Sequence, residues 1–244
     1  MIRRWMRALQ LDRTLSMALL GRLWQLGSGP ITVLLVARHM PPTVQGFYYT
    51  FASLMGLQSF MELGFYLVII NVASHEWAHL HLEADGRIGG DPVAKARLVS
   101  LGRLIFRWYG IGTLAFMALV GGLGFHLFGQ SAHPEVPWQA PWVAILLLQG
   151  MLFWGLGFNA LLEGCNQVRA IHTLRFQQAL LSSLAFWTVL MLGGGLWAAV
   201  ASALVMLGRD LYLVLVRYRG FFQTFWAPSP EGALSWRREV WPMQ

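Results

Sequence analysis

Long apolar runs separated by short polar segments dominate the chain. A helix needs about 20 consecutive, mostly apolar residues to cross the hydrocarbon core of a bilayer, and six stretches meet that length. They lie at about residues 15–37, 47–74, 104–128, 141–163, 173–192 and 195–216. The pattern predicts an all-α, polytopic membrane protein in which residues 1–220 form a lobe of six transmembrane helices. Residues 221–244 are then a cytoplasmic segment on the same side as the N-terminus.

Composition supports a membrane protein and excludes several other classes. Of the 244 residues, 56% are hydrophobic and 12% are charged, against roughly a quarter charged in an ordinary soluble domain; the mean hydropathy is +0.52. The single cysteine, Cys165, excludes a disulfide framework and cysteine-based zinc modules, because both need several thiols. The net charge of +7 accompanies no nucleic-acid-binding motif, so we expect no nucleic-acid partner, and we expect no cofactor.

The basic residues indicate the orientation in the membrane. The connections after the first, third and fifth predicted helices contain Arg38 as their only arginine or lysine. By the positive-inside rule, the side with the excess of Lys and Arg is cytoplasmic, and we expect both termini there. That side carries Arg3, Arg4, Arg7, Arg13, Arg87, Lys95, Arg97, Arg103, Arg107, Arg169, Arg175, Arg217, Arg219, Arg237 and Arg238.

Polar side chains inside the first two predicted helices are candidates for a cavity. Arg22, Gln25 and Ser28 recur on one face of the first helix, and Gln58 and Glu62 share a face of the second. Ionisable groups at this depth are costly and usually face a protein interior or a water-filled cavity. The sequence therefore predicts a polar seam that lines a substrate cavity. The alternative is an ion pair between Arg22 and Glu62 that only joins the two helices.

A second set of polar residues lies where the fourth and sixth predicted helices end. Asn159 and Glu163 are four residues apart on the fourth helix, and Arg209 and Asp210 are adjacent on the sixth. Both pairs lie close to the predicted cytoplasmic boundary, so they are candidates for a cytoplasmic gate. The alternative is that they reach water at the interface without a further role.

The segment His75-Glu76-Trp77-Ala78-His79 matches the zinc-peptidase pattern H-E-x-x-H. On a helix, the two histidines would share a face and bind Zn²⁺, with Glu76 as the base. A catalytic zinc site also needs a third protein ligand, and neither His81 nor Glu83 is well placed on that face. We therefore expect no metal site and no enzyme, and a membrane zinc peptidase using His75, Glu76 and His79 is a weaker alternative.

The order of residues resembles that of bacterial polysaccharide, or O-antigen-type, lipid-linked oligosaccharide flippases. These belong to the multidrug, oligosaccharidyl-lipid and polysaccharide exporter superfamily. The likeness extends over essentially the whole chain and includes "RLVSLGRLIFRWYG" at the third helix and the closing "LSWRREVWPMQ". Its other features are Arg22 early in the first helix, Ala37-Arg38 at the outer end, the Gly46-Phe47-Tyr48 turn and Glu62-Leu63-Gly64.

The resemblance implies a two-lobed helical transporter whose cleft opens alternately to either side of the bacterial inner membrane. Relatives move undecaprenyl-diphosphate-linked oligosaccharides and carry cationic residues in the cavity; Arg22 matches the arginine of the first helix, and Glu62 the acidic residue of the second. The 244 residues supply one lobe. We therefore expect an N-terminal lobe that needs a second six-helix lobe, from a missing C-terminal half or another chain. Half of a multidrug exporter is the alternative.

Overall fold

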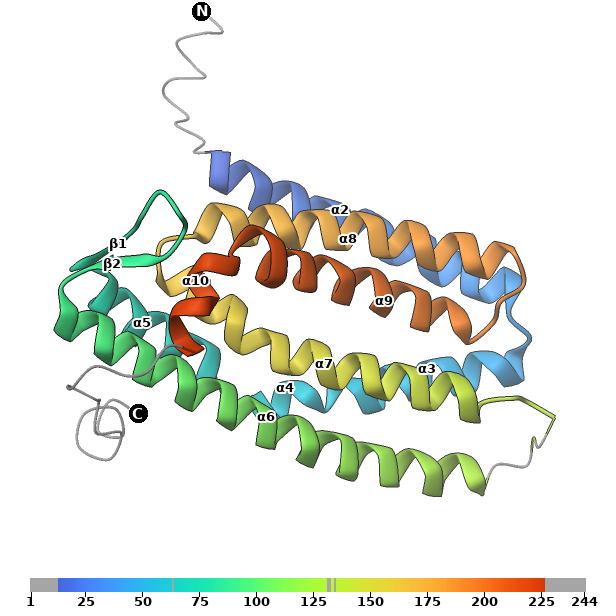
Figure 1. Ribbon diagram of the computed structural model, residues 1–244. Helices are drawn as coiled ribbons and strands as arrows, with labels where there is room; N and C mark the ends of the chain where they lie inside the picture. Colours follow the sequence, from blue (N-terminus) through green and yellow to red (C-terminus); the bar gives the residue numbers. More distant parts are fainter. Residues whose placement is uncertain (1–12, 63, 131–132, 134, 227–244) are drawn as a thin grey trace, which may run out of the picture.

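The computed structural model describes residues 13–62, 64–130, 133 and 135–226, which form an elongated helical bundle (Figure 1). Its long helices lie side by side in the order α2, α8, α9, α7 and α6. Elements α3, α4 and α5 pack against α6 and α7. The bounds are α2 Arg13–His39, α3 Pro42–Gly56, α4 Gln58–Glu62, α5 Phe65–Trp77, α6 Pro92–Gly129, α7 Gln139–Gly164, α8 Val168–Met191, α9 Trp197–Tyr212, a π-helix η1 Leu213–Arg217, α10 Arg219–Gln223 and a 3₁₀ helix η2 Thr224–Trp226.

Four helical segments in the described chain are long and apolar enough to cross a membrane. They are Leu19–His39, Pro92–Gly129, Gln139–Gly164 and Trp197–Arg217, and the bent pair Pro42–Glu62 and Phe65–Trp77 makes a fifth if it counts as one span. The expected all-α membrane protein is confirmed at this level. The predicted count of six spans is not confirmed, because α8, which covers the predicted span 173–192, is not among these candidates.

Polar residues in the first half of α8 explain why its hydropathy does not mark it as a candidate membrane span. Helix α8 lies between α2 and α9, and two of its polar side chains find protein partners there: Arg175 pairs with Glu163, and Gln178 donates to Asp210. Polar groups inside a helical membrane bundle are tolerated when they pair in this way. The polar residues in the first half of α8 are Arg169, His172, Thr173, Arg175, Gln177 and Gln178.

The second predicted span is broken rather than continuous. The chain was expected to form one helix over 47–74, but helix α3 already begins at Pro42, and α5 meets the preceding helices at a 44° bend. Gly64 precedes α5 with a φ of 73°, a left-handed conformation that glycine adopts at little cost. The break is a local property of Gly64, which a hydropathy average over the whole stretch does not detect.

Glycines allow α6 and α7 to pack closely. A Cβ atom on Gly124 would overlap the ring of Trp142, and one on Gly150 would lie 2.7 Å from Sδ of Met117. A Cβ atom on Gly122, which lies on α6 close to Gly124, would meet nothing within 4 Å. Small residues are common in membrane helix contacts because they let backbones approach, so the glycines at the contact serve packing.

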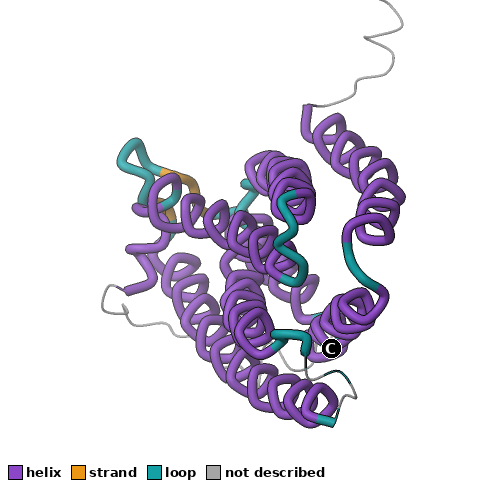
Figure 2. The backbone as a smooth tube through the Cα atoms, turned by 90° about the vertical axis from the view of Figure 1, so that its right-hand side faces the viewer, coloured by secondary structure: helices purple, strands orange, loops and turns teal. Residues whose placement is uncertain are grey.

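The two ends of the bundle differ in structure. A short antiparallel hairpin of β1 (Leu80–Leu82) and β2 (Ile88–Gly90) lies at one end with the start of α2 and α10 (Figure 1); we call this the hairpin end. The opposite end holds the connections α2–α3, α6–α7 and α8–α9. Turned by 90°, the bundle shows α2 at its edge (Figure 2). Helix α6 starts at the hairpin, where Asp91 caps it by accepting from Ala94 N at 2.9 Å.

Candidate functional site

The residues predicted to form a polar seam lie on separate parts of the bundle. Arg22 and Gln25 are exposed on α2, whereas Ser28 is buried. Helix α2 packs mainly along α8, while Gln58 of α4 accepts a hydrogen bond from Gln149 of α7 at 2.7 Å. Within the described chain, Arg22 and Glu62 form no ion pair with each other. Their role in a substrate cleft stays a prediction.

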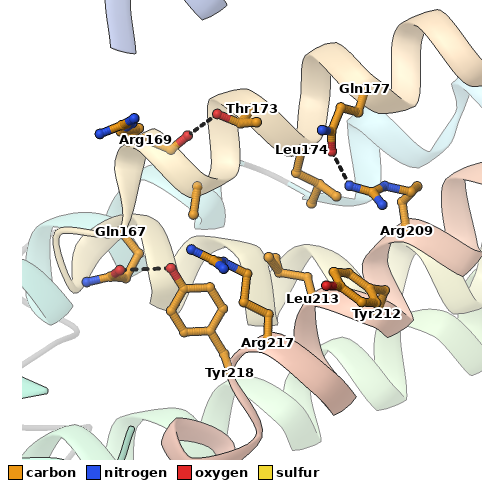
Figure 3. Close-up of a pocket in the computed structure, with 11 residues that line it drawn as sticks. Gln167, Arg169, Thr173, Leu174, Gln177, Arg209, Tyr212, Leu213, Arg217 and Tyr218 are labelled. Carbon is orange, nitrogen blue, oxygen red and sulfur yellow. Dashed lines mark hydrogen bonds between the residues drawn. The ribbon is translucent and has the colours of Figure 1, made fainter. Parts of the chain in front are cut away.

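A polar cavity of about 670 Å³ lies between α8 and the end of α9 (Figure 3). Three arginines line it: Arg169 from the start of α8, Arg209 from α9 and Arg217 from η1. None of the described residues around it is an aspartate or glutamate. We call it the arginine pocket. Its other lining residues are Gln167, Ala170, Thr173, Leu174, Gln177, Tyr212, Leu213 and Tyr218.

Neighbouring side chains hold two of these arginines in place. Arg209 donates to Oε1 of Gln177, and its guanidinium lies 5.4 Å from the centre of the Tyr212 ring (Figure 3). Its Nε is buried without a hydrogen-bond partner among the described residues. Arg217 lies 5.8 Å from the ring centre of Tyr218. Ring contacts of this kind position a guanidinium without neutralising its charge.

The hydroxyl of Tyr218 adds an uncharged donor to the pocket wall. It donates to Oε1 of Gln167 at 2.8 Å. Gln167 lies just before α8 and Tyr218 just after η1, so this bond links the two segments. Burial raises the pKa of Tyr218 above its ordinary value, and the Arg217 guanidinium only partly offsets this. The hydroxyl is therefore protonated at neutral pH, and the pocket carries positive charge without a tyrosinate to reduce it.

The arginine pocket has the features of an anion site. Guanidinium groups bind phosphate oxygens with two parallel hydrogen bonds, and the N-terminal end of a helix such as α8 favours negative charge. Arg169 and Arg217 are exposed and form no ion pair in the part of the chain that the structure describes. The arrangement supports binding of a phosphate or diphosphate group and offers no nucleophile paired with a base.

The four predicted gate residues lie in three different surroundings. Asn159 Nδ2 donates to Oδ1 of Asp210 at 3.3 Å, and Gln178 Nε2 donates to the same oxygen at 3.0 Å. Asp210 is 8% exposed, so it points into the bundle, and the alternative of solvation at the interface is wrong for this residue. Arg209, its neighbour, faces the arginine pocket instead.

Glu163 belongs to a hydrogen-bonded triad that joins three helices. Its Oε2 accepts from the Tyr66 hydroxyl of α5 at 2.6 Å and from Arg175 of α8 at 3.0 Å. The Arg175 guanidinium also lies 5.5 Å from the centre of the Tyr66 ring. Arg175 is thus balanced by a carboxylate, in contrast to the arginines of the pocket.

The H-E-x-x-H segment does not form one helical face. Helix α5 ends at Trp77, so His79 lies beyond it and loses the i, i+4 relation to His75. Glu76 is buried and lies 3.9 Å from Arg97 and 3.6 Å from His75. Across the described ranges, no three His, Cys, Asp or Glu side chains are grouped so that they could hold a metal ion.

Of the residues that line the arginine pocket, Arg209 alone had a predicted site role. Arg169 and Arg217 served in the sequence only as markers of orientation, and Tyr218 was not singled out. Their partners lie far along the chain, as for Tyr218 and Gln167, which are 51 residues apart. The cluster of basic residues at the ends of the last two predicted helices was the one available signal.

The chain matches no protein-family model, and neither a curated protein nor a solved structure matches it. The arginine pocket and the buried Asp210 cluster are therefore the features from which a function can be argued.

Proposed function

We propose that this chain is one lobe of a transporter that flips an undecaprenyl-diphosphate-linked oligosaccharide across the bacterial inner membrane by alternating access. The observation that carries the proposal is the arginine pocket, with three arginines and no carboxylate among the described residues around it. A diphosphate is the part of such a substrate that three guanidinium groups recognise. Two bidentate contacts to phosphate oxygens are strong and geometrically specific.

The position of the pocket is consistent with loading from one side of the membrane. The pocket lies where α8 begins and α9 ends, at the hairpin end of the bundle. The positive-inside rule assigns this end to the cytoplasm. A lipid-linked substrate in the inner leaflet has its diphosphate at this depth, so the pocket would receive the headgroup before it crosses.

The second lobe and the exposed face of α2 complete the proposal. Arg22 and Gln25 are exposed on α2 at the edge of the bundle, where a second six-helix lobe would enclose them in a cleft. An arginine in such a low-dielectric cleft would bind the diphosphate during transfer. One lobe alone is then expected to bind the headgroup without flipping it.

Binding of three lipids that differ only in charge tests the proposal. The purified chain in neutral lipid nanodiscs is titrated with undecaprenyl diphosphate, undecaprenyl phosphate and uncharged undecaprenol. We expect the diphosphate to bind most tightly. Replacing Arg169 or Arg217 by Gln should weaken binding by about 10-fold each, since a charged hydrogen bond contributes roughly 1.5–3 kcal/mol.

Arg38→Gln is the matched control, because Arg38 is at the opposite end of the bundle. It should leave the affinity unchanged. Arg169 and Arg217 are both exposed, so their substitution should not disturb folding. Equal binding of undecaprenol, or an affinity that the double variant Arg169→Gln/Arg217→Gln does not alter, would contradict the proposal.

A further inference from the structure

A second cavity lies on another face of α9 and has the opposite chemical character. It has a volume of about 350 Å³ and shares no lining residue with the arginine pocket. Four aromatic side chains line it: Trp154 and Phe158 of α7, Phe222 of α10 and Trp226 of η2. We call it the aromatic groove. Its other lining residues are Met151, Gly155, Leu207, Asp210, Leu211, Val214, Leu215, Arg219 and Gln223.

Asp210 is the only carboxylate among the described residues around the groove, and only one of its oxygens is used. Oδ1 accepts from Asn159 and Gln178, whereas Oδ2 accepts no hydrogen bond from any residue that the structure describes. Gly155 lies beside Oδ2: a Cβ atom there would be 3.4 Å away. Because Gly155 also lines the groove, no side chain at this position separates the oxygen from the cavity.

No cation among the described residues neutralises this carboxylate by direct contact, since Asp210 forms no ion pair with any of them. Arg175 of α8 acts on it electrostatically, but Arg175 is paired with Glu163 of α7. Arg209 is turned toward Gln177 in the other cavity. A carboxylate that is 8% exposed within a membrane helix is costly in its ionised form, and a bound cation would offset that cost.

We propose that the aromatic groove binds an amphiphilic organic cation, with its charged centre at Oδ2 of Asp210 and its apolar groups between the aromatic rings. Aromatic faces attract cations, most strongly when water is excluded, and apolar walls bury the rest of such a molecule. The site is independent of the proposed function, which places an anion in the arginine pocket.

Arg219 is the feature of the groove with the opposite charge. It is exposed and belongs to α10 at the hairpin end, whereas Asp210 is buried in α9. Charges act more strongly in a low-dielectric interior than beside water, so Asp210 should decide the sign of the ligand. An anionic lipid held by Arg219 is the competing occupant, and the test must separate the two.

Tetraphenylphosphonium and tetraphenylborate separate them, because the two ions have nearly the same shape and opposite charge. Binding of each to the purified chain in detergent is measured by equilibrium dialysis. We expect the phosphonium to bind and the borate to bind much more weakly. Asp210→Asn keeps an oxygen that accepts from Asn159 and Gln178 but removes the charge, and should weaken phosphonium binding by at least about 10-fold.

Two further variants keep the test decisive. Leu211→Trp fills the groove while leaving Asp210 in place, and it should also weaken phosphonium binding. Asp85→Asn removes an exposed carboxylate of the hairpin and should have no effect. Preferential binding of the borate that Arg219→Gln abolishes would overturn the proposal, and so would an unchanged phosphonium affinity in Asp210→Asn. An excess of phosphonium should not displace undecaprenyl diphosphate, so the two sites can fail separately.

Discussion

The thiol of Cys165 shows at the scale of one residue how the bundle shields a reactive group. Cys165 follows the last residue of α7 and has 0% of its surface exposed. Burial raises the pKa of this thiol well above its ordinary value. The thiolate is the nucleophilic form, so a raised pKa lowers the reactive fraction at neutral pH, and burial also blocks access.

We therefore expect Cys165 to react with a maleimide much more slowly in the folded protein than in detergent-denatured protein. Because the chain has no other cysteine, the labelled fraction measured by mass spectrometry reports on this residue alone. The difference should persist as the pH rises from about 7 to about 9, since the folded pKa lies above that range. Equal labelling rates in the two states would show that the end of α7 is open.

The single residues of the candidate sites were partly foreseeable. Asp210 was predicted as a gate residue near the cytoplasmic boundary, whereas the structure buries it and pairs it with Asn159 and Gln178. Gln178 could not be chosen from the sequence, because nothing local indicates which face of α8 meets α9. The same reason explains why Arg169 and Arg217 were recognised as basic residues but not as neighbours of one cavity.

At the scale of elements, the packing of α6 against α7 depends on glycines. Gly122 and Gly124 of α6 are two residues apart but have different surroundings. Gly124→Ala would push a methyl group into the ring of Trp142, whereas Gly122→Ala meets nothing within 4 Å. Overpacking of a tight contact usually costs about 1–3 kcal/mol. We expect Gly124→Ala to lower the thermal unfolding temperature and Gly122→Ala to leave it unchanged or raise it, since alanine favours helix.

The comparison uses two alanine substitutions on one helix, so helix propensity is matched and only the contact differs. Thermal unfolding in detergent, followed by circular dichroism, measures both. If the two variants unfolded at the same temperature, the contact between α6 and α7 would be looser than the structure describes.

Hydropathy predicts a helix well when the helix is apolar along its whole length. It predicts poorly where a single residue sets the point at which a helix begins or breaks. The third predicted span, at about 104–128, lies within the longer helix α6, which begins at Pro92 because Asp91 caps it there. The break before α5 depends on Gly64, and the β-hairpin of 80–90 on three residue pairs. Neither changes an average over about 20 residues enough to be detected.

At the scale of the whole molecule, the number of membrane crossings depends on whether α8 crosses the membrane. In Figure 1 α8 runs the length of the bundle beside α2 and α9, although its hydropathy does not mark it as a span. Two of its polar groups, Arg175 and Gln178, pair with protein neighbours, which hydropathy does not take into account. The prediction of six crossings therefore requires the α8–α9 connection to lie on the opposite side of the membrane from the hairpin.

Single cysteines at three exposed positions test this path in cells, in a Cys165→Ala background. The positions are Arg87 in the hairpin, Gln130 after α6 and Leu192 after α8, which is 81% exposed. A membrane-impermeant maleimide added outside should label Gln130→Cys and Leu192→Cys, and should label Arg87→Cys only after the cells are permeabilised. The positive-inside rule assigns the hairpin to the cytoplasm, and six crossings return the α8–α9 connection to the outside.

Labelling of Leu192→Cys only after permeabilisation would show that α8 does not cross, and labelling of Arg87→Cys in intact cells would show the reverse orientation. The first result would contradict six crossings, and the second would move the arginine pocket away from the cytoplasmic side, where an inner-leaflet diphosphate would meet it.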